Sequence, residues 1–261
     1  MPEIAVDGVG KVYHSAGRQV TALGRVDLTI ADGEFVSLVG PSGCGKSTLL
    51  NIIAGFLEPS AGGIRVDGRP VAGQIPPQLG YIFQKDTVLP WYSVRRNIGL
   101  GLRFRGWPRR KIDDRVDELL KLGKLEGFGE AFPHQLSGGM RRRVALLMSL
   151  ACDPRILLLD EPFGALDTHT KTVLHQELIR IWRSLGQTIV MVTHDLDEAI
   201  TLSDRVVVLS GPPSRVLLDE RIGIAHPRDV FSLRESDAFA QAYARIWHVL
   251  GQQFASVEAT G

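Results

Sequence analysis

The hydrophobic pattern changes in character over the first sixty residues. Apolar and polar positions alternate over 20–23 and 26–30, which predicts half-exposed antiparallel strands. Residues 35–39 are mostly apolar, so we expect a buried strand there, then a glycine-rich loop and a helix over 47–54. Further short strand signals follow at 64–66, 80–83, 155–159, 188–192 and 205–209. These runs predict a protein built around a buried sheet.

Residues 93–150 interrupt the strand signals with a helical pattern. One amphipathic helix is marked by an apolar stripe with charged residues between its members: Val116, Leu119, Leu120 and Leu122. A β-rich start, a helical insert and a returning α/β pattern predict an α/β fold with a parallel-sheet core and a helical subdomain. Beyond a turn at 211–213, one strand and one amphipathic helix remain, which is too little for an independent regulatory domain.

Composition and charge reduce the number of functional classes to which such a chain can belong. Its 261 residues are 44% hydrophobic and carry a formal net charge of +1, so a sizeable core is expected. Because no basic surplus is present, we expect no nucleic-acid partner. Cys44 and Cys152 suggest neither a disulfide framework nor a zinc site, and no secretory signal precedes the first strand, which fits a reducing cytoplasm. No apolar run approaches roughly 20 residues, so any role at a membrane would require a partner.

The loop after the first buried strand has residues suited to binding phosphate. It fits G-x-x-x-x-G-K-[ST] with the following residues: Gly40, Pro41, Ser42, Gly43, Cys44, Gly45, Lys46 and Ser47. Glycines let backbone N–H groups point at phosphate oxygens, and the following helix adds its positive N-terminal dipole. Lys46 would reach the β- and γ-phosphates, Ser47 would bind Mg²⁺, and Thr48 belongs to the same loop. The flanking strand and helix favour a nucleotide-binding loop over an accidental glycine-rich turn.

An acidic pair at the end of a later buried strand is the second part of a nucleotide site. Residues 156–159 are followed by Asp160 and Glu161. A buried strand can deliver Asp160 to a magnesium ion, and Glu161 could polarise the attacking water as a general base. Strands often end in acidic residues, so this signal is weak alone and gains its meaning from the phosphate-binding loop.

A glycine-containing peptide makes the class of nucleotide-binding protein more specific. Leu136-Ser137-Gly138-Gly139-Met140, twenty residues before Asp160, resembles the signature peptide of ABC ATPases. Two glycines at a helix start expose backbone N–H groups to an anion, and Ser137 adds a hydroxyl donor. Taken alone, such a peptide would more often be a plain helix cap.

The resemblance to ABC ATPases extends over nearly the whole chain. Tyr13 is similar to the aromatic residue that stacks on adenine, and Gln84 to the glutamine of the Q-loop. The segment 164–167, ending at the nucleotide-contacting Asp167, matches the D-loop, and His194 matches the histidine switch. Taken singly, Tyr13 could cover an apolar edge, Gln84 could be a turn residue and His194 a helix cap. Because all of these motifs occur together and in the order found in the family, we favour the nucleotide-related roles over these structural ones.

The resemblance implies a fold, a dimer and a set of roles. The fold would be a P-loop NTPase with a RecA-like parallel-sheet subdomain, an N-terminal antiparallel β subdomain and a helical signature subdomain. ATP would lie between two cassettes, of a homodimer or of a heterodimer with a paralogue, facing Ser137, Gly138 and Gly139 of the second chain. The implied magnesium ligands are Ser47, Gln84 and Asp160. The implied catalytic residues are Lys46, Gln84, Glu161 and His194.

Departures from the family pattern fall on the helix after the signature peptide. They are Met140, Arg142, Leu147 and Met148. None is expected to touch the catalytic groups, so we predict altered packing and two competent sites in a homodimer. We expect one ATPase domain over 1–230, with the helical part inserted at about 90–152, and a C-terminal helical tail over 231–261.

The single compact cassette resembles the ATPase subunit of an importer. Leu89 and Trp91 lie in a segment similar to the one that receives the permease in importer cassettes, although they could simply pack the helical subdomain. This implies integral-membrane permease subunits, an indirect periplasmic or extracellular solute-binding protein, and a peripheral location on the cytoplasmic face of the inner membrane.

Finer features resemble the nitrate, sulfonate and taurine uptake group. They are the Pro90-Trp91 pair, Met140, and a tail with Pro227-Arg228 and Ile246-Trp247. This predicts uptake of a small anion, with a pyrimidine-type or other nitrogenous nutrient as the nearest competitor. The alternative from another class is a soluble ABC ATPase that acts as an assembly or mechanical factor without a permease.

Overall fold

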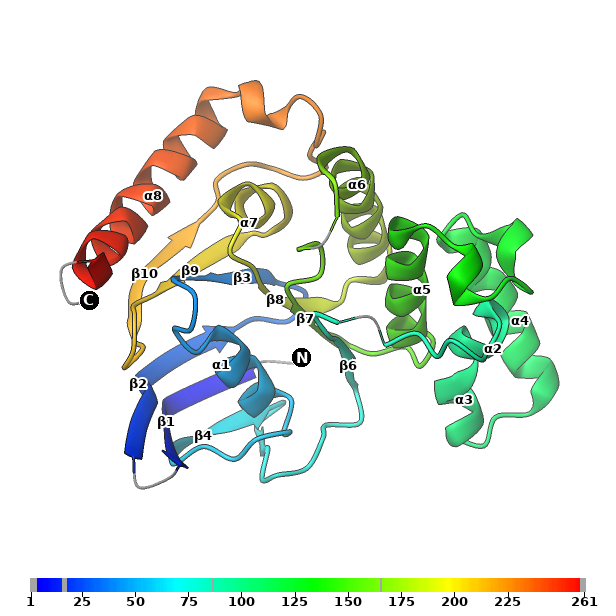
Figure 1. Ribbon diagram of the computed structural model, residues 1–261, viewed down its shortest axis with the longest axis horizontal. Coiled ribbons are helices and arrows are strands. Elements are labelled where there is room, and N and C mark those ends of the chain that lie inside the picture. The colour runs from blue at the N-terminus through cyan, green and yellow to red at the C-terminus, as the bar shows by residue number, and fades with distance from the viewer. Residues whose placement is uncertain (1–3, 16–17, 86, 165, 259–261) are drawn as a thin grey trace.

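The computed structural model describes residues 4–15, 18–85, 87–164 and 166–258, and its strands there form two sheets. Figure 1 shows the larger sheet between helices, with the smaller sheet below it and a lobe of short helices to one side. The larger sheet has the order β10-β9-β3-β8-β7-β6 and the smaller the order β2-β1-β4-β5. This arrangement agrees with the predicted α/β fold.

The smaller sheet is antiparallel. Its strands are β1 (Ile4–Ser15), β2 (Arg18–Ile30), β4 (Ala61–Val66) and β5 (Arg69–Pro70). The two predicted strands over 20–23 and 26–30 form one continuous strand, and β1, which pairs with it, was not predicted. Register shifts along β1 include one between Val6 and Val9, and Gly8 there has φ of 56°. This irregularity explains why a simple alternation is missing from the sequence of β1.

The larger sheet is parallel except at one edge, where β10 runs antiparallel to β9. Its strands are β3 (Phe35–Val39), β6 (Leu79–Ile82), β7 (Ile156–Asp160), β8 (Thr188–Val192), β9 (Arg205–Leu209) and β10 (Val216–Arg221). Every residue of β3 and β8 is buried. Helices on both faces account for the continuous apolar runs, because neither face of a central strand meets water.

Helices cover the larger sheet and build the side lobe. Those around the sheet are α1 (Lys46–Ile53), α6 (Thr168–Leu185), α7 (Leu196–Leu202) and α8 (Asp237–Glu258). The lobe contains α2 (Val94–Ile98), α3 (Leu100–Phe104), α4 (Arg109–Leu122) and α5 (Gly138–Leu150). Short 3₁₀ turns lie at Glu126–Phe128, Pro133–Gln135 and Leu233–Glu235. The helical stretch predicted over 93–150 is thus divided at glycine and proline residues.

The core of the helical lobe is continuous with the core beneath the sheet. Ile98 and Leu147 of the lobe belong to one buried cluster with Leu157 of β7 and Trp182 of α6. On the other side, α8 closes a third cluster over α7 and β9. Of the helices in the described ranges, none is both long and apolar enough to cross a membrane.

Candidate functional site

The loop between β3 and α1 has a backbone that requires glycine. Gly43 and Gly45 have φ of 75° and 98°, in the left-handed region that side chains disfavour. A Cβ on Gly45 would also lie 2.8 Å from Leu23 Cδ2. Gly45 caps α1 without a side-chain hydrogen bond, so no cap side chain covers the first N–H groups of that helix. An anion could approach this helix end directly.

Lys46 is folded back over this loop. Its Nζ donates to the carbonyl oxygens of Gly40 at 2.8 Å and Pro41 at 2.9 Å, and the residue is only 6% exposed. The ammonium group is therefore held at the loop, where a phosphate bound by the loop would meet it.

Asp160 lies at the carboxyl end of β7, opposite the start of α1. Ser47 Oγ donates to Asp160 Oδ1 at 2.8 Å. Tyr81 on the adjacent strand β6 makes a longer hydrogen bond to Asp160 Oδ2 at 3.4 Å and a shorter one to Asn51 Oδ1 at 3.0 Å. Burial raises the pKa of Asp160, and the hydrogen bond from Ser47 opposes this effect. Sequence reasoning missed Tyr81 and Asn51, because neither belongs to a recognisable motif.

Glu161 is contacted by two of the predicted residues at a single carboxylate oxygen. Gln84 Nε2 donates to Glu161 Oε2 at 2.9 Å, and His194 Nδ1 lies 3.3 Å from the same oxygen. Glu161 has φ of 43°, which is uncommon for a residue with a side chain and is costly unless the surroundings enforce it. Its N–H donates to Val192 O on β8 at 2.9 Å, which helps to fix this conformation.

Tyr13 reaches the first turn of α1 from the smaller sheet. Its hydroxyl lies 3.4 Å from Thr48 Oγ1, and the residue is 40% exposed. Lys11, which lies on the same strand β1, places its Nζ 5.4 Å from the centroid of the Tyr13 ring. The ring is thus placed beside the phosphate-binding loop with part of its surface free for stacking.

The signature peptide lies elsewhere, at the start of α5. Ser137 caps this helix by accepting a hydrogen bond from Met140 N at 3.2 Å, and a Cβ on Gly139 would lie 2.6 Å from Thr170 Cγ2 of α6. Figure 1 shows α5 beside α6, in a different part of the molecule from α1. Asp167 caps α6 by accepting from Thr170 N at 3.0 Å. Ala165 of the D-loop segment lies outside the described residues.

The structure therefore sorts the predicted residues into two groups. The first surrounds the phosphate-binding loop and comprises Tyr13, residues 40–48, Gln84, Asp160, Glu161 and His194. The second comprises Ser137, Gly138, Gly139 and Asp167, at the N-terminal ends of α5 and α6. The described residues contain no hydrogen bond or ion pair that links a side chain of the second group to one of the first.

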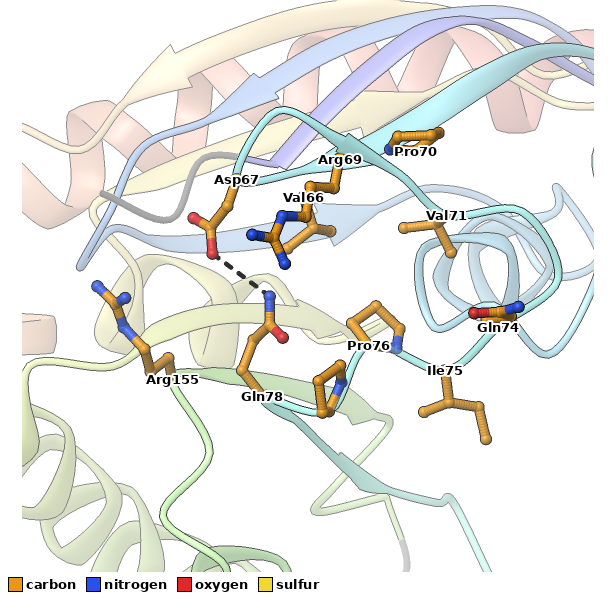
Figure 2. Close-up of a pocket in the computed structure, with 11 residues that line it drawn as sticks. Val66, Asp67, Arg69, Pro70, Val71, Gln74, Ile75, Pro76, Gln78 and Arg155 are labelled. Atoms are coloured by element: carbon orange, nitrogen blue, oxygen red, sulfur yellow. Dashed lines mark hydrogen bonds between the residues drawn. The ribbon is translucent and has the colours of Figure 1, made fainter.

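A separate hollow of about 490 Å³ lies away from both groups. Figure 2 shows it between β5 and the loop before β6, with Gln78 reaching Asp67 and with Arg155 at one edge. Gln78 Nε2 donates to Asp67 Oδ2 at 3.3 Å, and the Arg155 side chain is 58% exposed. None of the predicted site residues lines this hollow, so we locate the site at the phosphate-binding loop instead.

Comparison with known proteins identifies the class of this nucleotide-binding fold. The family model described as ABC transporter matches residues 23–164, which is more than half of the chain. The chain therefore belongs to the ABC transporter family, and it is an ATPase.

Individual relatives are similar over most of their length. The taurine import ATP-binding protein TauB of Rhizobium johnstonii is 46% identical over 238 residues, which are 90% of each chain. The nitrate import ATP-binding protein NrtD of Synechocystis sp. is 44% identical over 213 residues, covering 82% of this chain and 80% of that protein. These relatives confirm the predicted resemblance.

A solved structure confirms the predicted fold. It is a dimeric ATP-binding cassette in a post-hydrolysis state, bound to ADP and Pi, with a TM-score of 0.74 and 32% sequence identity. The match covers 85% of this chain and 100% of that one. The antiparallel sheet, the mainly parallel sheet and the helical lobe are thus those of an ABC ATPase.

Proposed function

We propose that this chain is the ATP-hydrolysing subunit of an ABC importer and that it drives the uptake of a small anion. ATP hydrolysis is supported by the way Gln84 and His194 both approach one carboxylate oxygen of Glu161. The hydrogen-bonded pair Ser47–Asp160 lies next to this group. The relatives TauB and NrtD are import proteins for taurine and for nitrate respectively, which supports import of such an anion by this chain.

In this proposal the phosphate-binding loop holds the triphosphate of ATP. Backbone N–H groups of the loop and of the first turn of α1 would bind phosphate oxygens, and Lys46 would exchange its loop carbonyl partners for the β- and γ-phosphates. Tyr13 would stack on adenine, with its hydroxyl directed to Thr48. The phosphate and adenine contacts would then fix opposite ends of one nucleotide.

The oxygen atoms around Asp160 fit a magnesium ion. The described part of the chain has no cluster of three or more His, Cys, Asp or Glu side chains able to hold a metal alone. However, Mg²⁺ prefers oxygen ligands and is commonly held by one or two carboxylates together with substrate phosphates. We therefore assign Ser47, Asp160 and Gln84 as its protein ligands. When bound, Mg²⁺ would neutralise charge on the phosphate oxygens.

Glu161 is proposed as the general base. The attacking water would give a proton to its carboxylate while the water oxygen bonds to the γ-phosphorus. The bond between that phosphorus and the bridging oxygen would break, and ADP and phosphate would leave. Gln84 and His194 lie close enough to orient the carboxylate and the water. This arrangement suits the near-attack geometry on which such catalysis depends.

The site is proposed to be completed by a second cassette. The exposed Ser137 and the adjacent glycines Gly138 and Gly139 present a helix N-terminus that is remote from the chain's own phosphate-binding loop. Asp167, at the start of α6, would lie at the same dimer contact. The similar solved cassette is itself dimeric, which supports this proposal. Two ATP molecules would be enclosed between two copies, or between this chain and a paralogue.

A permease is the proposed membrane partner. Trp91 is 66% exposed, and the loop that carries it is fixed by the buried Asn97, which hydrogen-bonds to both the N–H and the carbonyl group of Leu89. A rigid loop with an exposed indole is suited to a protein contact. We propose that the chain thereby attaches to the cytoplasmic face of the cell membrane. The ATPase domain is proposed to span 1–230, with residues 90–152 inserted and 231–261 as a tail.

Reconstitution in proteoliposomes would test the whole proposal. The cassette would be combined with its permease and solute-binding protein, and uptake of labelled taurine, nitrate and an aliphatic sulfonate would be measured with enclosed ATP. We expect uptake of one of these anions, and loss of uptake with Glu161→Gln. ATP hydrolysis without uptake or permease association would instead favour a soluble assembly or mechanical factor. Uptake of none of these anions by a complex that hydrolyses ATP would refute the assigned solute class.

A further inference from the structure

A buried ionic cluster lies directly behind His194. Glu198, in the first turn of α7, is 2% exposed and accepts a hydrogen bond from Thr193 Oγ1 at 2.7 Å. Its second oxygen lies 3.0 Å from Nζ of Lys171 on α6. Lys171 Nζ also lies 3.5 Å from Asp195 Oδ2. The cluster therefore joins the segment that carries His194 to the helix that begins after Asp167.

The hydroxyl of Thr193 connects this cluster to the backbone on the other side of His194. It donates to Glu198 and accepts a hydrogen bond from Asp195 N at 3.0 Å. A hydroxyl rotates freely until a partner fixes its hydrogen, and here the carboxylate of Glu198 provides that partner. Both neighbours of His194 are held in this way, whereas the His194 side chain itself is 55% exposed. The backbone of the histidine is thus fixed and its ring remains available.

The same cluster contacts the segment that follows Glu161. The ring of His175 meets Phe163 edge to face, with centroids 4.6 Å apart, and His175 Nε2 lies 3.9 Å from Glu198 Oε1. Burial lowers the pKa of His175 to about 4, so this imidazole is neutral at pH 7. Segments next to Glu161, Asp167 and His194 therefore all meet around one carboxylate.

A role in packing alone would not require this chemistry. A buried carboxylate is costly to desolvate, and well-packed apolar residues often stabilise such a position as well or better. Burial raises the pKa of Glu198, while the hydrogen bond from Thr193 and the nearby ammonium group of Lys171 act in the opposite direction. The feature that apolar residues could not supply is a fixed direction for the Thr193 hydroxyl beside the histidine.

We propose that Glu198 is a positioning residue that acts through Thr193 to hold His194 against Glu161. The inference rests on the proposed role of His194 in ATP hydrolysis. Small displacements of catalytic groups can reduce rates by about 100-fold. Loss of the Thr193–Glu198 hydrogen bond should therefore slow the chemical step and leave the binding of nucleotide unchanged.

The decisive comparison is Thr193→Val against Thr193→Ser in the full-length protein. Valine has the shape of threonine but lacks the hydroxyl, and we expect it to reduce kcat about 10- to 100-fold. The KM for ATP and the Kd of a fluorescent ATP analogue should not change. Serine keeps the hydroxyl and should recover most of the lost turnover. Thr172→Val is the matched control, since that half-buried hydroxyl donates to Thr168 O in its own helix.

A double-mutant cycle tests whether Thr193 acts through Glu198. If it does, Glu198→Met, whose side chain has a similar shape but no oxygen to accept from the Thr193 hydroxyl, should combine with Thr193→Val to give a variant hardly slower than the slower single variant. The positioning role would be overturned by wild-type kcat in Thr193→Val, by a serine variant as slow as the valine variant, or by a parallel loss of nucleotide affinity. His194→Ala is measured alongside. Wild-type hydrolysis by that variant would contradict the proposed role of His194, whereas wild-type hydrolysis by Thr193→Val alone would contradict only the positioning role of Glu198.

Discussion

The phosphate-binding loop and the signature peptide differ in where their polar groups find partners. Around the loop, Lys46, Ser47 and Glu161 are held by groups from the same chain, several of them distant in sequence. In the signature peptide, the hydroxyl of Ser137 accepts a hydrogen bond from Met140 of its own helix. One region is therefore organised within the chain, and the other presents a helix end outward. This difference is the one expected of a site that two chains share.

Hydrogen bonds nevertheless run from the helix of the signature peptide toward Glu161. Arg142, on the helix that begins with the signature glycines, donates from Nη1 to the carbonyl oxygen of Phe83 at 2.8 Å. Phe83 precedes Gln84, which in turn donates to Glu161. Arg142, which departs from the family pattern, therefore contacts the residue next to Gln84, a predicted catalytic group. A displacement of α5 would therefore be expected to shift the backbone next to Gln84.

Glu161→Gln should have the largest effect on the phosphate-binding side of the comparison. Glutamine has nearly the same shape but cannot accept a proton, so we expect kcat for ATP hydrolysis to fall about 10²- to 10⁴-fold. Nucleotide affinity should remain, and the ATP-bound variant should accumulate as a dimer. Steady-state kinetics and light scattering would measure both results. Glu126→Gln, on an exposed turn of the helical lobe, is the control, and near-normal turnover of the Glu161 variant would remove Glu161 from the role of base.

Lys46→Ala should weaken nucleotide binding itself. The ammonium group is buried at the loop and is the cation best placed for the β- and γ-phosphates. We expect the Kd of a fluorescent ATP analogue to rise about 100-fold, or about 2.7 kcal/mol. The exposed Lys121 provides the matched control, Lys121→Ala. An unchanged Kd would mean that the loop backbone binds the phosphates without help from Lys46.

The parts that could be predicted from the sequence are those with local causes. The phosphate-binding loop and the buried strands were predictable because backbone conformation and burial on both faces restrict the residue types at consecutive positions. β1 was missed because glycines and register shifts interrupt its alternation. The contact of Tyr81 with Asp160 depends on tertiary packing, and so do the contacts of Glu198 with Thr193 and Lys171. No periodic pattern in the sequence predicts such contacts.

Gly139→Ala tests the signature side of the comparison with a smaller effect. The added Cβ would lie 2.6 Å from Thr170 Cγ2, so α5 must shift away from α6. We expect kcat to fall about tenfold, because a displaced helix start would face the partner's nucleotide poorly. The Kd of the isolated chain for nucleotide should not change, since this residue is remote from its own phosphate-binding loop.

Thr170→Ser offers a way to separate crowding from other effects of that change. It removes the crowded methyl group, so the double variant Gly139→Ala/Thr170→Ser should regain much of the lost turnover. The single variant Thr170→Ser is the control for the second substitution. A Gly139 variant whose nucleotide affinity falls as much as its turnover would contradict the division of the site between two chains.

Tyr81→Phe should have the smallest effect, because it removes one hydroxyl behind the proposed magnesium ligand. Tyr81 hydrogen-bonds to Asn51 at 3.0 Å and more weakly to Asp160 at 3.4 Å. Loss of the Tyr81 hydroxyl should reduce the free energy of unfolding by about 1 kcal/mol. The Mg²⁺ concentration that gives half-maximal hydrolysis should rise about fivefold, which corresponds to a similar energy. Denaturant titration and a magnesium titration after treatment with EDTA would measure these changes, with Tyr243→Phe on α8 as control. A loss of stability without any change in magnesium dependence would show that Tyr81 supports α1 through Asn51 and leaves Asp160 unaffected.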